Sequence, residues 1–305
     1  MEKISENSLA SRLTQNEIQK RMPELQNSIS LNIQGRSRKQ STGETGFIAY
    51  ARSCISRMQD EGKYDAAHKL GSYLGRFIAY LGKNEIAFRD FDSVLMRNYH
   101  TWLENRELGR NSISLYIRNL KRVYRLAVEE GVAKENHPFD GVDVSYRVKK
   151  EKTGLTLEEV RRIKELDLRN QSKAVNFARD MFLFSVYARG MTADDMFHLR
   201  RENIKDGNLV YTSKITGRKE TILWEPLLEK IADKYSRPDT PFLFPVITSE
   251  DPKEQWRQHC AALHNINRNL KTVARLSEIP CPLNMTVAHH TWKSMTKGLT
   301  IGNLL

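Results

Sequence analysis

The sequence has little cysteine and no long apolar run. Its three cysteines, Cys54, Cys260 and Cys281, are odd in number and far apart, which fits neither a disulfide framework nor a zinc site. No apolar run approaches the roughly 18 residues that a membrane span needs, and the N-terminus has no apolar signal segment. We therefore expect a cytoplasmic protein with no membrane partner.

Several catalytic signatures are absent as well. The chain contains no Walker loop, no G-x-G-x-x-G and no G-x-S-x-G. His259 and His264 are spaced wrongly on an expected helix for joint ligation of a metal, and the adjacent His289 and His290 point apart. From this pattern we expect no metal, no cofactor and no small-molecule substrate.

Positive charge is what the chain has in excess. Its 49 Lys and Arg against 37 Asp and Glu give a net charge of +12, which favours a polyanionic partner. Such an excess can also be plain solvated surface, so the placement of the basic residues decides the interpretation. At 305 residues the chain is long enough for two domains.

The spacing of apolar residues predicts helices through most of the first half. Two of them end at Gly62 and Gly82, a third runs from about Ser93 to Glu107, and a fourth ends at Gly131. We expect a flexible N-terminal arm or remnant module over 1–42, and a helical domain over 43–137. A basic linker over 138–153 and a second domain over 154–305 then follow.

The fourth predicted helix has the clearest pattern. One face is apolar by its i, i+3, i+4 spacing. The opposite face is basic and holds Arg118, Lys121, Arg122 and Arg125. Solvated faces usually mix Glu with Lys, and this stripe contains almost no acid. We interpret it as a phosphate-contacting helix, with a solvated face as the alternative.

The second domain begins with a capping box of Thr156 and Glu159. Helices are predicted through Leu166 and from about Ser172 to Ala188, followed by a β-hairpin over 208–213 and 220–224. A long helix near Lys253 to Arg275 closes the pattern. Two more basic groups are candidate backbone contacts: Arg147, Lys149 and Lys150 in the linker, and Arg268, Lys271 and Arg275 on the long helix.

Arg189 ends an apolar run that begins at Met181. A guanidinium in such a place is costly unless it meets an anion. That anion is either an internal carboxylate, Asp194 or Asp195, or a phosphate brought by a partner. The basic character of the chain favours the phosphate.

Taken in order, these segments resemble the tyrosine recombinases, or phage-type integrases, with closest similarity to the branch common in Bacteroides-type mobile elements. The likeness runs from about Gly46 to Trp292 and is carried by RNSISLYIRNL (110–120), LTLEEVRRI (155–163), FLFSVYARGMTADDM (182–196) and VAHHTW (287–292). It implies a mainly α, two-domain DNA clamp. A helical core-binding, SAM-like domain would precede a mostly helical catalytic-type domain with a small β-hairpin. The implied partners are double-stranded DNA and other copies of the chain.

The resemblance also implies a catalytic set in which fixed cations stabilise a phosphorus transition state without a metal. Arg189 occupies the place of the first family arginine, while His289, followed by His290, stands where the second is expected. An imidazole cannot copy a bidentate guanidinium fork. Loss of one such cation typically lowers the rate by about 10²–10³.

The lysine of the family hairpin corresponds to Ile215 in this sequence, with Lys214 one residue earlier. Neighbours on a strand point to opposite faces, so Lys214 replaces the family lysine only if a β-bulge re-aims the chain. Lys219, across the turn, is a weaker substitute.

The family nucleophile is a tyrosine beyond the His289 slot, but the last tyrosine here is Tyr235 and the sequence given stops at Leu305. We therefore expect a catalytic domain that is incomplete at its C-terminus and forms no covalent DNA link by itself. The expected function is DNA integration and site-specific recombination of a mobile element. The alternatives are a catalytically inactive DNA-binding regulator or competitor of an intact recombinase and, less favoured, a helical protein-interaction module. Whether the chain is an enzyme is left open.

Overall fold

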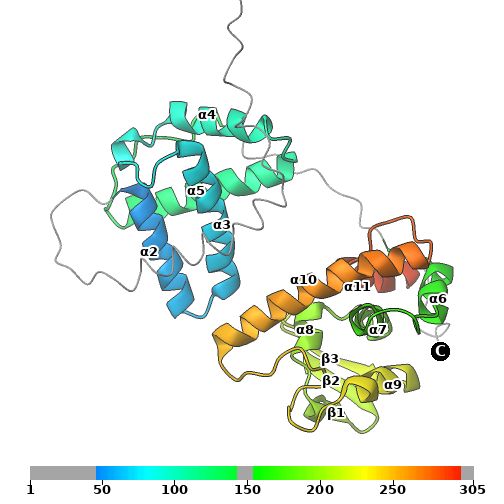
Figure 1. The fold of residues 1–305 in the computed structure, drawn as a ribbon. Helices are drawn as coiled ribbons and strands as arrows, with labels where there is room; N and C mark the ends of the chain where they lie inside the picture. Colours follow the sequence, from blue (N-terminus) through cyan, green and yellow to red (C-terminus); the bar gives the residue numbers. More distant parts are fainter. Residues whose placement is uncertain (1–45, 143–153, 297–305) are drawn as a thin grey trace, which may run out of the picture. The chain divides into compact units, whose positions relative to one another are not determined.

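The computed structural model describes residues 46–142 and 154–296 (Figure 1). Within them the chain forms ten α-helices, two short 3₁₀ helices and one three-stranded antiparallel sheet. The expected mainly helical fold with a small sheet is therefore confirmed. None of the described helices is both long and apolar enough to cross a membrane.

Four helices occupy the first described range, and their bounds agree closely with the predicted pattern: α2 Phe47–Asp60, α3 Tyr64–Leu81, α4 Ser93–Glu104 and α5 Arg110–Glu129. Gly82 closes α3 in the left-handed conformation, with φ of 65°, which a glycine adopts without steric cost. The third helix ends at Glu104, earlier than the expected Glu107. After Glu104 the chain turns, and Glu107 itself has a φ of 54°.

Aromatic side chains fill the core of these four helices. Phe47 stacks on Phe91 with ring centroids 4.2 Å apart, and Phe91 stacks in turn on Tyr124 of α5 at 5.6 Å. The buried face of α5 is Ile113, Ser114, Ile117, Leu120, Val123, Tyr124 and Ala127. The predicted apolar face of α5 is thus confirmed, although Tyr116, which the same spacing places on that face, is only half-buried. The basic stripe is held on the other side of this packed face.

The second described range contains six helices and the sheet: α6 Leu157–Glu165, α7 Lys173–Tyr187, α8 Ala193–Phe197, α9 Pro226–Tyr235, α10 Pro252–Leu276 and α11 Met285–Met295, with β1 Ile204–Lys205, β2 Asn208–Thr212 and β3 Lys219–Leu223. The predicted capping box of Thr156 and Glu159 forms at the start of α6. In the antiparallel sheet, Val210 of β2 lies opposite Thr221 of β3. The helices α8, α9 and α11 and the strand β1 were not predicted from the sequence.

Helix α7 is the central element of this range. Its residues from Asp180 to Val186 are all buried, and α6, α9, α10 and α11 pack against it (Figure 1). A helix that is apolar on nearly all sides has to be enclosed in this way. The C-terminus of α7, where Arg189 follows, therefore lies among several elements at once.

One buried carboxylate joins α9 to α7. Asp180 accepts hydrogen bonds from Lys234 Nζ at 2.6 Å, Tyr235 Oη at 2.8 Å and Arg179 Nε at 2.8 Å. A buried charge with this many donors is well compensated. Because α9 begins three residues after β3, the anchor also limits where the chain that leaves β3 can run.

Two separate hydrophobic clusters form in the described residues. One uses side chains between Phe47 and Val142, and the other uses side chains between Leu155 and Ala288. The expected arm over 1–42 lies outside the described residues. So do most of the expected linker, with Arg147, Lys149 and Lys150, and the segment after residue 296. The domain boundaries inferred from the sequence stay predictions.

Candidate functional site

Arg189 sits in a left-handed turn at the end of α7. Its φ is 56° and that of Gly190 is 72°, and a non-glycine residue in this region carries a strain of about 1–2 kcal/mol. The turn is held by two hydrogen bonds. Gly190 N–H donates to Ser185 O at 2.8 Å, and Ser185 Oγ donates to Met191 O at 2.6 Å. Strained residues retained by such bonds concentrate at functional sites.

Arg189 is exposed, and its guanidinium contacts the main chain of the sheet and neither candidate carboxylate. Its Nη1 donates a long, 3.5 Å hydrogen bond to the main-chain oxygen of Thr221 on β3. Within residues 46–142 and 154–296 it forms no ion pair with an acid. The internal pair with Asp194 or Asp195 that the sequence left open is therefore not formed.

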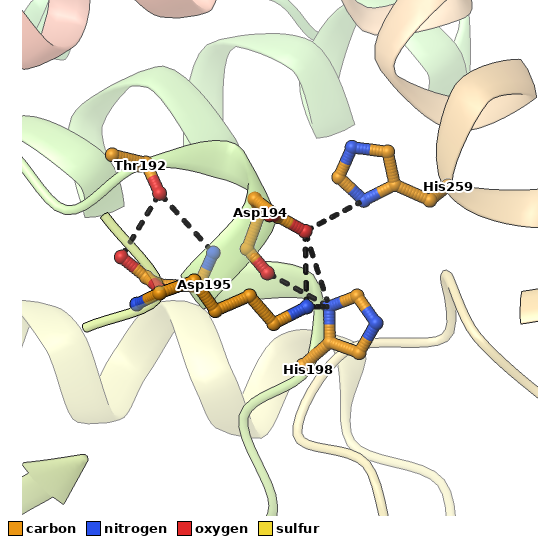
Figure 2. Close-up of polar contacts among 6 residues, drawn as sticks. Thr192, Asp194, Asp195, His198 and His259 are labelled. Carbon is orange, nitrogen blue, oxygen red and sulfur yellow. Dashed lines mark hydrogen bonds and ion pairs between the residues drawn. The ribbon is translucent and has the colours of Figure 1, made fainter. Parts of the chain in front are cut away.

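The two aspartates hold Lys214 instead. Asp195 Oδ1 accepts the main-chain N–H of Lys214 at 2.8 Å, and Asp194 Oδ1 accepts from Lys214 Nζ at 3.0 Å. Thr192 caps α8 by accepting the Asp195 N–H, and its Oγ1 donates to Asp195 Oδ2 at 2.9 Å (Figure 2). Asp195 is thereby locked in place as the anchor of the lysine loop.

Lys214 lies in a loop and not on a strand. Strand β2 ends at Thr212, and Ser213 N–H bonds to Arg218 O at 2.9 Å across the turn. The argument from strand alternation was therefore wrong at this position, because a loop residue need not alternate and no bulge is required. Ile215, which the resemblance aligned with the family lysine, is 71% exposed, and Lys219 begins β3 as an exposed residue.

His289 and the Arg189 turn are in direct contact. The Nδ1 of His289 on α11 lies 2.5 Å from the main-chain oxygen of Gly190, so the imidazole donates from Nδ1 and leaves Nε2 as an acceptor. Lys293 Nζ is 3.2 Å from that Nε2. Sequence reasoning missed Lys293, although its i+4 spacing from His289 on a helix was a usable signal. His290 is half-buried, with its ring centroid 5.2 Å from that of His289.

Two histidines that the sequence did not bring together lie beside Lys214. His198 Nδ1 and His259 Nδ1 are each 3.7 Å from Asp194 Oδ1 (Figure 2). Burial lowers the pKa of both imidazoles, so both are neutral around pH 7. His198 also lies 3.0 Å from Lys214 Nζ. The local spacing of His259 and His264 on α10 gave no hint of this cluster.

The basic stripe on α5 is less free than its sequence suggests. Arg118 donates to Ser114 O and Ser114 Oγ of its own helix, and Arg125 pairs with Glu129 at 3.6 Å. Lys121 is half-buried, with its Nζ 5.7 Å from the Phe139 ring centroid. Arg122 is exposed. The stripe is therefore partly occupied by internal contacts, and of its four cations only Arg122 is both exposed and without such a contact in the described residues.

The basic face of α10 is more open. Arg268, Lys271 and Arg275 are all exposed, opposite the buried residues Leu270, Val273 and Ala274. Arg268 donates to the neutral side chain of Asn265 at 3.1 Å. None of the three cations pairs with a carboxylate in the described part of the chain. Of the basic groups within the described residues, this is the one whose three cations are all exposed and without a carboxylate partner.

Comparison with known proteins agrees with this architecture. Residues 46–144 match the family model of the phage integrase SAM-like domain. A lambda integrase dimer bound to a COC′ core site is similar in structure, with 14% identity, 94% of this chain and 81% of that chain covered, and a TM-score of 0.60. The Tn1549 transposon integrase in complex with transposon right end DNA is also similar, with 11% identity and a TM-score of 0.55. The match covers 84% of this chain and 88% of that chain. No curated protein sequence matches the chain.

The first described range thus matches the phage integrase SAM-like domain, and the described chain has the same fold as the lambda and Tn1549 integrases. The resemblance drawn from the sequence is confirmed at this level. Its narrower assignment to the Bacteroides-type branch stays a prediction, as do the roles of the individual site residues.

Gly190 is the position where the turn tolerates no side chain. A Cβ there would lie 2.8 Å from His289 O, whereas a Cβ on Gly207, with nearly the same φ of 71°, would meet nothing within 4 Å. We expect Gly207→Ala to lower the free energy of unfolding by about 1–2 kcal/mol through backbone strain alone. Gly190→Ala adds an overpacking cost of about 1–3 kcal/mol. Urea denaturation of both variants measures the difference, and equal losses would contradict the contact between the turn and α11.

Proposed function

We propose that this chain binds duplex DNA as a protein of the tyrosine recombinase type and takes part in DNA integration and site-specific recombination of a mobile element. The observation that carries the proposal is the Arg189 guanidinium. It is exposed, fixed in a strained turn, and unpaired with any acid in the described residues. A planar guanidinium fork fits two phosphate oxygens at once.

The surroundings of Arg189 support a phosphate rather than another anion. Lys293 lies beside His289, which contacts the same turn, and Lys214 lies on the hairpin whose β3 accepts the Arg189 bond. Cations carried on adjoining elements attract a group with high local negative charge. The nucleic-acid backbone supplies such groups in a regular row.

The similar structures support both proposed partners. The lambda and Tn1549 integrases were solved with DNA, and lambda integrase forms a dimer on a core site and a tetramer on a Holliday junction. For the present chain we propose the same two partners, double-stranded DNA and further copies of itself.

The open face of α10 is the place to test DNA binding. Each phosphate contact contributes about 0.9 to the slope of log affinity against log salt. Replacing Arg268, Lys271 and Arg275 together with alanine should reduce the magnitude of that slope by about 2–3 on random-sequence duplex. The triple variant of Arg118, Arg122 and Arg125 should reduce it by only about 1–2, because Arg118 and Arg125 already have internal partners.

Arg169→Ala is the matched control, because Arg169 is exposed but already paired with Asp167 at 2.7 Å. It should leave the slope unchanged. If the α10 variant keeps the same slope of log affinity against log salt as the unmodified chain, this face does not bind the DNA backbone. If the unmodified chain associates with duplex DNA only weakly and independently of salt, it does not bind the DNA backbone. That result would favour a protein-interaction module.

A second candidate function is a catalytically inactive DNA-binding regulator or competitor of an intact recombinase. It is favoured by His289 in the place of the second arginine and by the raised pKa values of three tyrosines in 154–296. Burial raises the pKa of Tyr187, Tyr211 and Tyr235, and the hydroxyl of Tyr235 also donates to Asp180. A phenol attacks phosphorus only as it loses its proton, so these three are poor nucleophiles.

A covalent-capture experiment separates the two functions. Duplexes selected from a random pool by the chain itself are nicked, incubated with it, and run on a denaturing gel. If the chain is an inactive regulator, it should bind these duplexes without forming a covalent protein–DNA adduct. An adduct that survives denaturation would contradict the regulator function and establish strand cleavage.

A further inference from the structure

Four polar side chains from three segments meet beside the lysine loop. Asp194 lies on α8, His198 immediately after it, His259 on α10, and Lys214 between β2 and β3. Asp194 Oδ1 is the shared centre, at 3.7 Å from Nδ1 of each histidine and 3.0 Å from Lys214 Nζ. Figure 2 shows the two imidazoles approaching Asp194 from different elements.

The spacing of these atoms fits a small metal ion. Ligands at about 2.0–2.2 Å from a tetrahedral zinc ion are separated from one another by about 3.4 Å. The 3.7 Å separations on Asp194 are within a few tenths of an ångström of that value. One ligand atom from each of Asp194, His198 and His259 lies within 4.8 Å of the others.

The donor set is also the right chemistry. Two imidazoles and one carboxylate, with a position left for water, suit zinc and similar transition-metal ions. An imidazole nitrogen binds such an ion through its lone pair. The Nδ1 of His259 is buried without a hydrogen-bond partner in the described residues. A buried polar atom without a partner is destabilising, and a coordinate bond would supply the missing partner.

A positive charge already occupies the centre of the cluster. The Lys214 ammonium is 3.0 Å from both Asp194 Oδ1 and His198 Nδ1. The site therefore selects a cation, and Lys214 is the cation that a metal has to displace. His198 Nδ1 also lies 2.7 Å from Asp194 O, so ligation would shift its proton to Nε2 and exchange that hydrogen bond for a metal bond.

We propose that Asp194, His198 and His259 form a binding site for a divalent transition-metal ion of the zinc class, which competes with the Lys214 side chain for Asp194. Metal binding frees the Lys214 ammonium, while its backbone stays anchored on Asp195. The inference does not depend on DNA binding. It couples the position of a candidate phosphate-binding lysine to the metal.

Calorimetric titration of the chain with zinc chloride tests the site, and cobalt(II) absorption gives its geometry. We expect one zinc ion per chain. Asp194→Asn should weaken binding by at least about tenfold, since even partners of metal ligands contribute about 10–100-fold. Asp194 is half-exposed, so this variant keeps the fold. His259→Ala should act in the same direction.

Lys214→Met gives a result that a simple structural role would not. It removes the competing ammonium, so zinc affinity should rise several-fold. His264→Ala and Cys260→Ser are matched controls on α10, because both residues are exposed and outside the set of ligands. They should leave affinity unchanged.

Three outcomes would overturn the proposal. These are no zinc binding by the unmodified chain, unchanged affinity in Asp194→Asn, and loss of binding in Cys260→Ser. A lack of zinc binding by the unmodified chain would count against the site even if Lys214→Met binds zinc.

Discussion

The turn that follows α7 is the constraint on which the rest of the site depends. Arg189 and Gly190 both adopt the left-handed conformation, and the main-chain oxygen of Gly190 is held by His289. A side chain at Gly190 would collide with α11. The close approach of α11 to the end of α7 thus fixes the direction in which Arg189 leaves the core. It also brings two residues that are distant in the sequence into one contact.

The acids next to this turn are used in a way that leaves the arginine free. Asp195 anchors the backbone of Lys214 and Asp194 its side chain, so neither neutralises Arg189. Had either carboxylate paired with Arg189, the guanidinium would have had a stable internal role and a phosphate would have had to compete for it. The division of partners gives the site an accessible fork on a rigid support, which is the arrangement that binding of a phosphate requires.

The sequence predicted those parts of the fold that depend on local pattern. Glycines such as Gly82 and the Thr156 capping box marked helix ends correctly, because these residues act on their own turn of helix. The place of Arg189 at the end of a buried helix could also be predicted. Helices α9 and α11 were missed, since α9 depends on Asp180 of α7 for its position and α11 on packing against α7.

In the candidate site, too, local features could be predicted from the sequence and features that depend on distant residues could not. The position of Lys214 could not be predicted from strand alternation, because Asp195, far away in the sequence, holds it in a loop. The cluster of His198 and His259 was equally hidden, since it forms only when α8 and α10 pack in the second domain. Charge counting on α5 could not show that Arg118 and Arg125 already have partners within the helix. For Lys214 and the two histidines, tertiary contacts decide the position, whereas on α5 local i, i+4 contacts with Ser114 and Glu129 occupy two of the cations.

The most direct measurement of the account's central claim is the side-chain NMR signal of Arg189 during titration with duplex DNA. The Nε–H resonance is assigned by its loss in Arg189→Lys. If Arg189 binds phosphate, the signal shifts and its hydrogen exchange slows on ordinary duplex. It stays unchanged on a duplex of the same sequence with uncharged methylphosphonate linkages. An Arg189 signal that does not respond while the chain binds ordinary duplex would contradict the role proposed for this arginine.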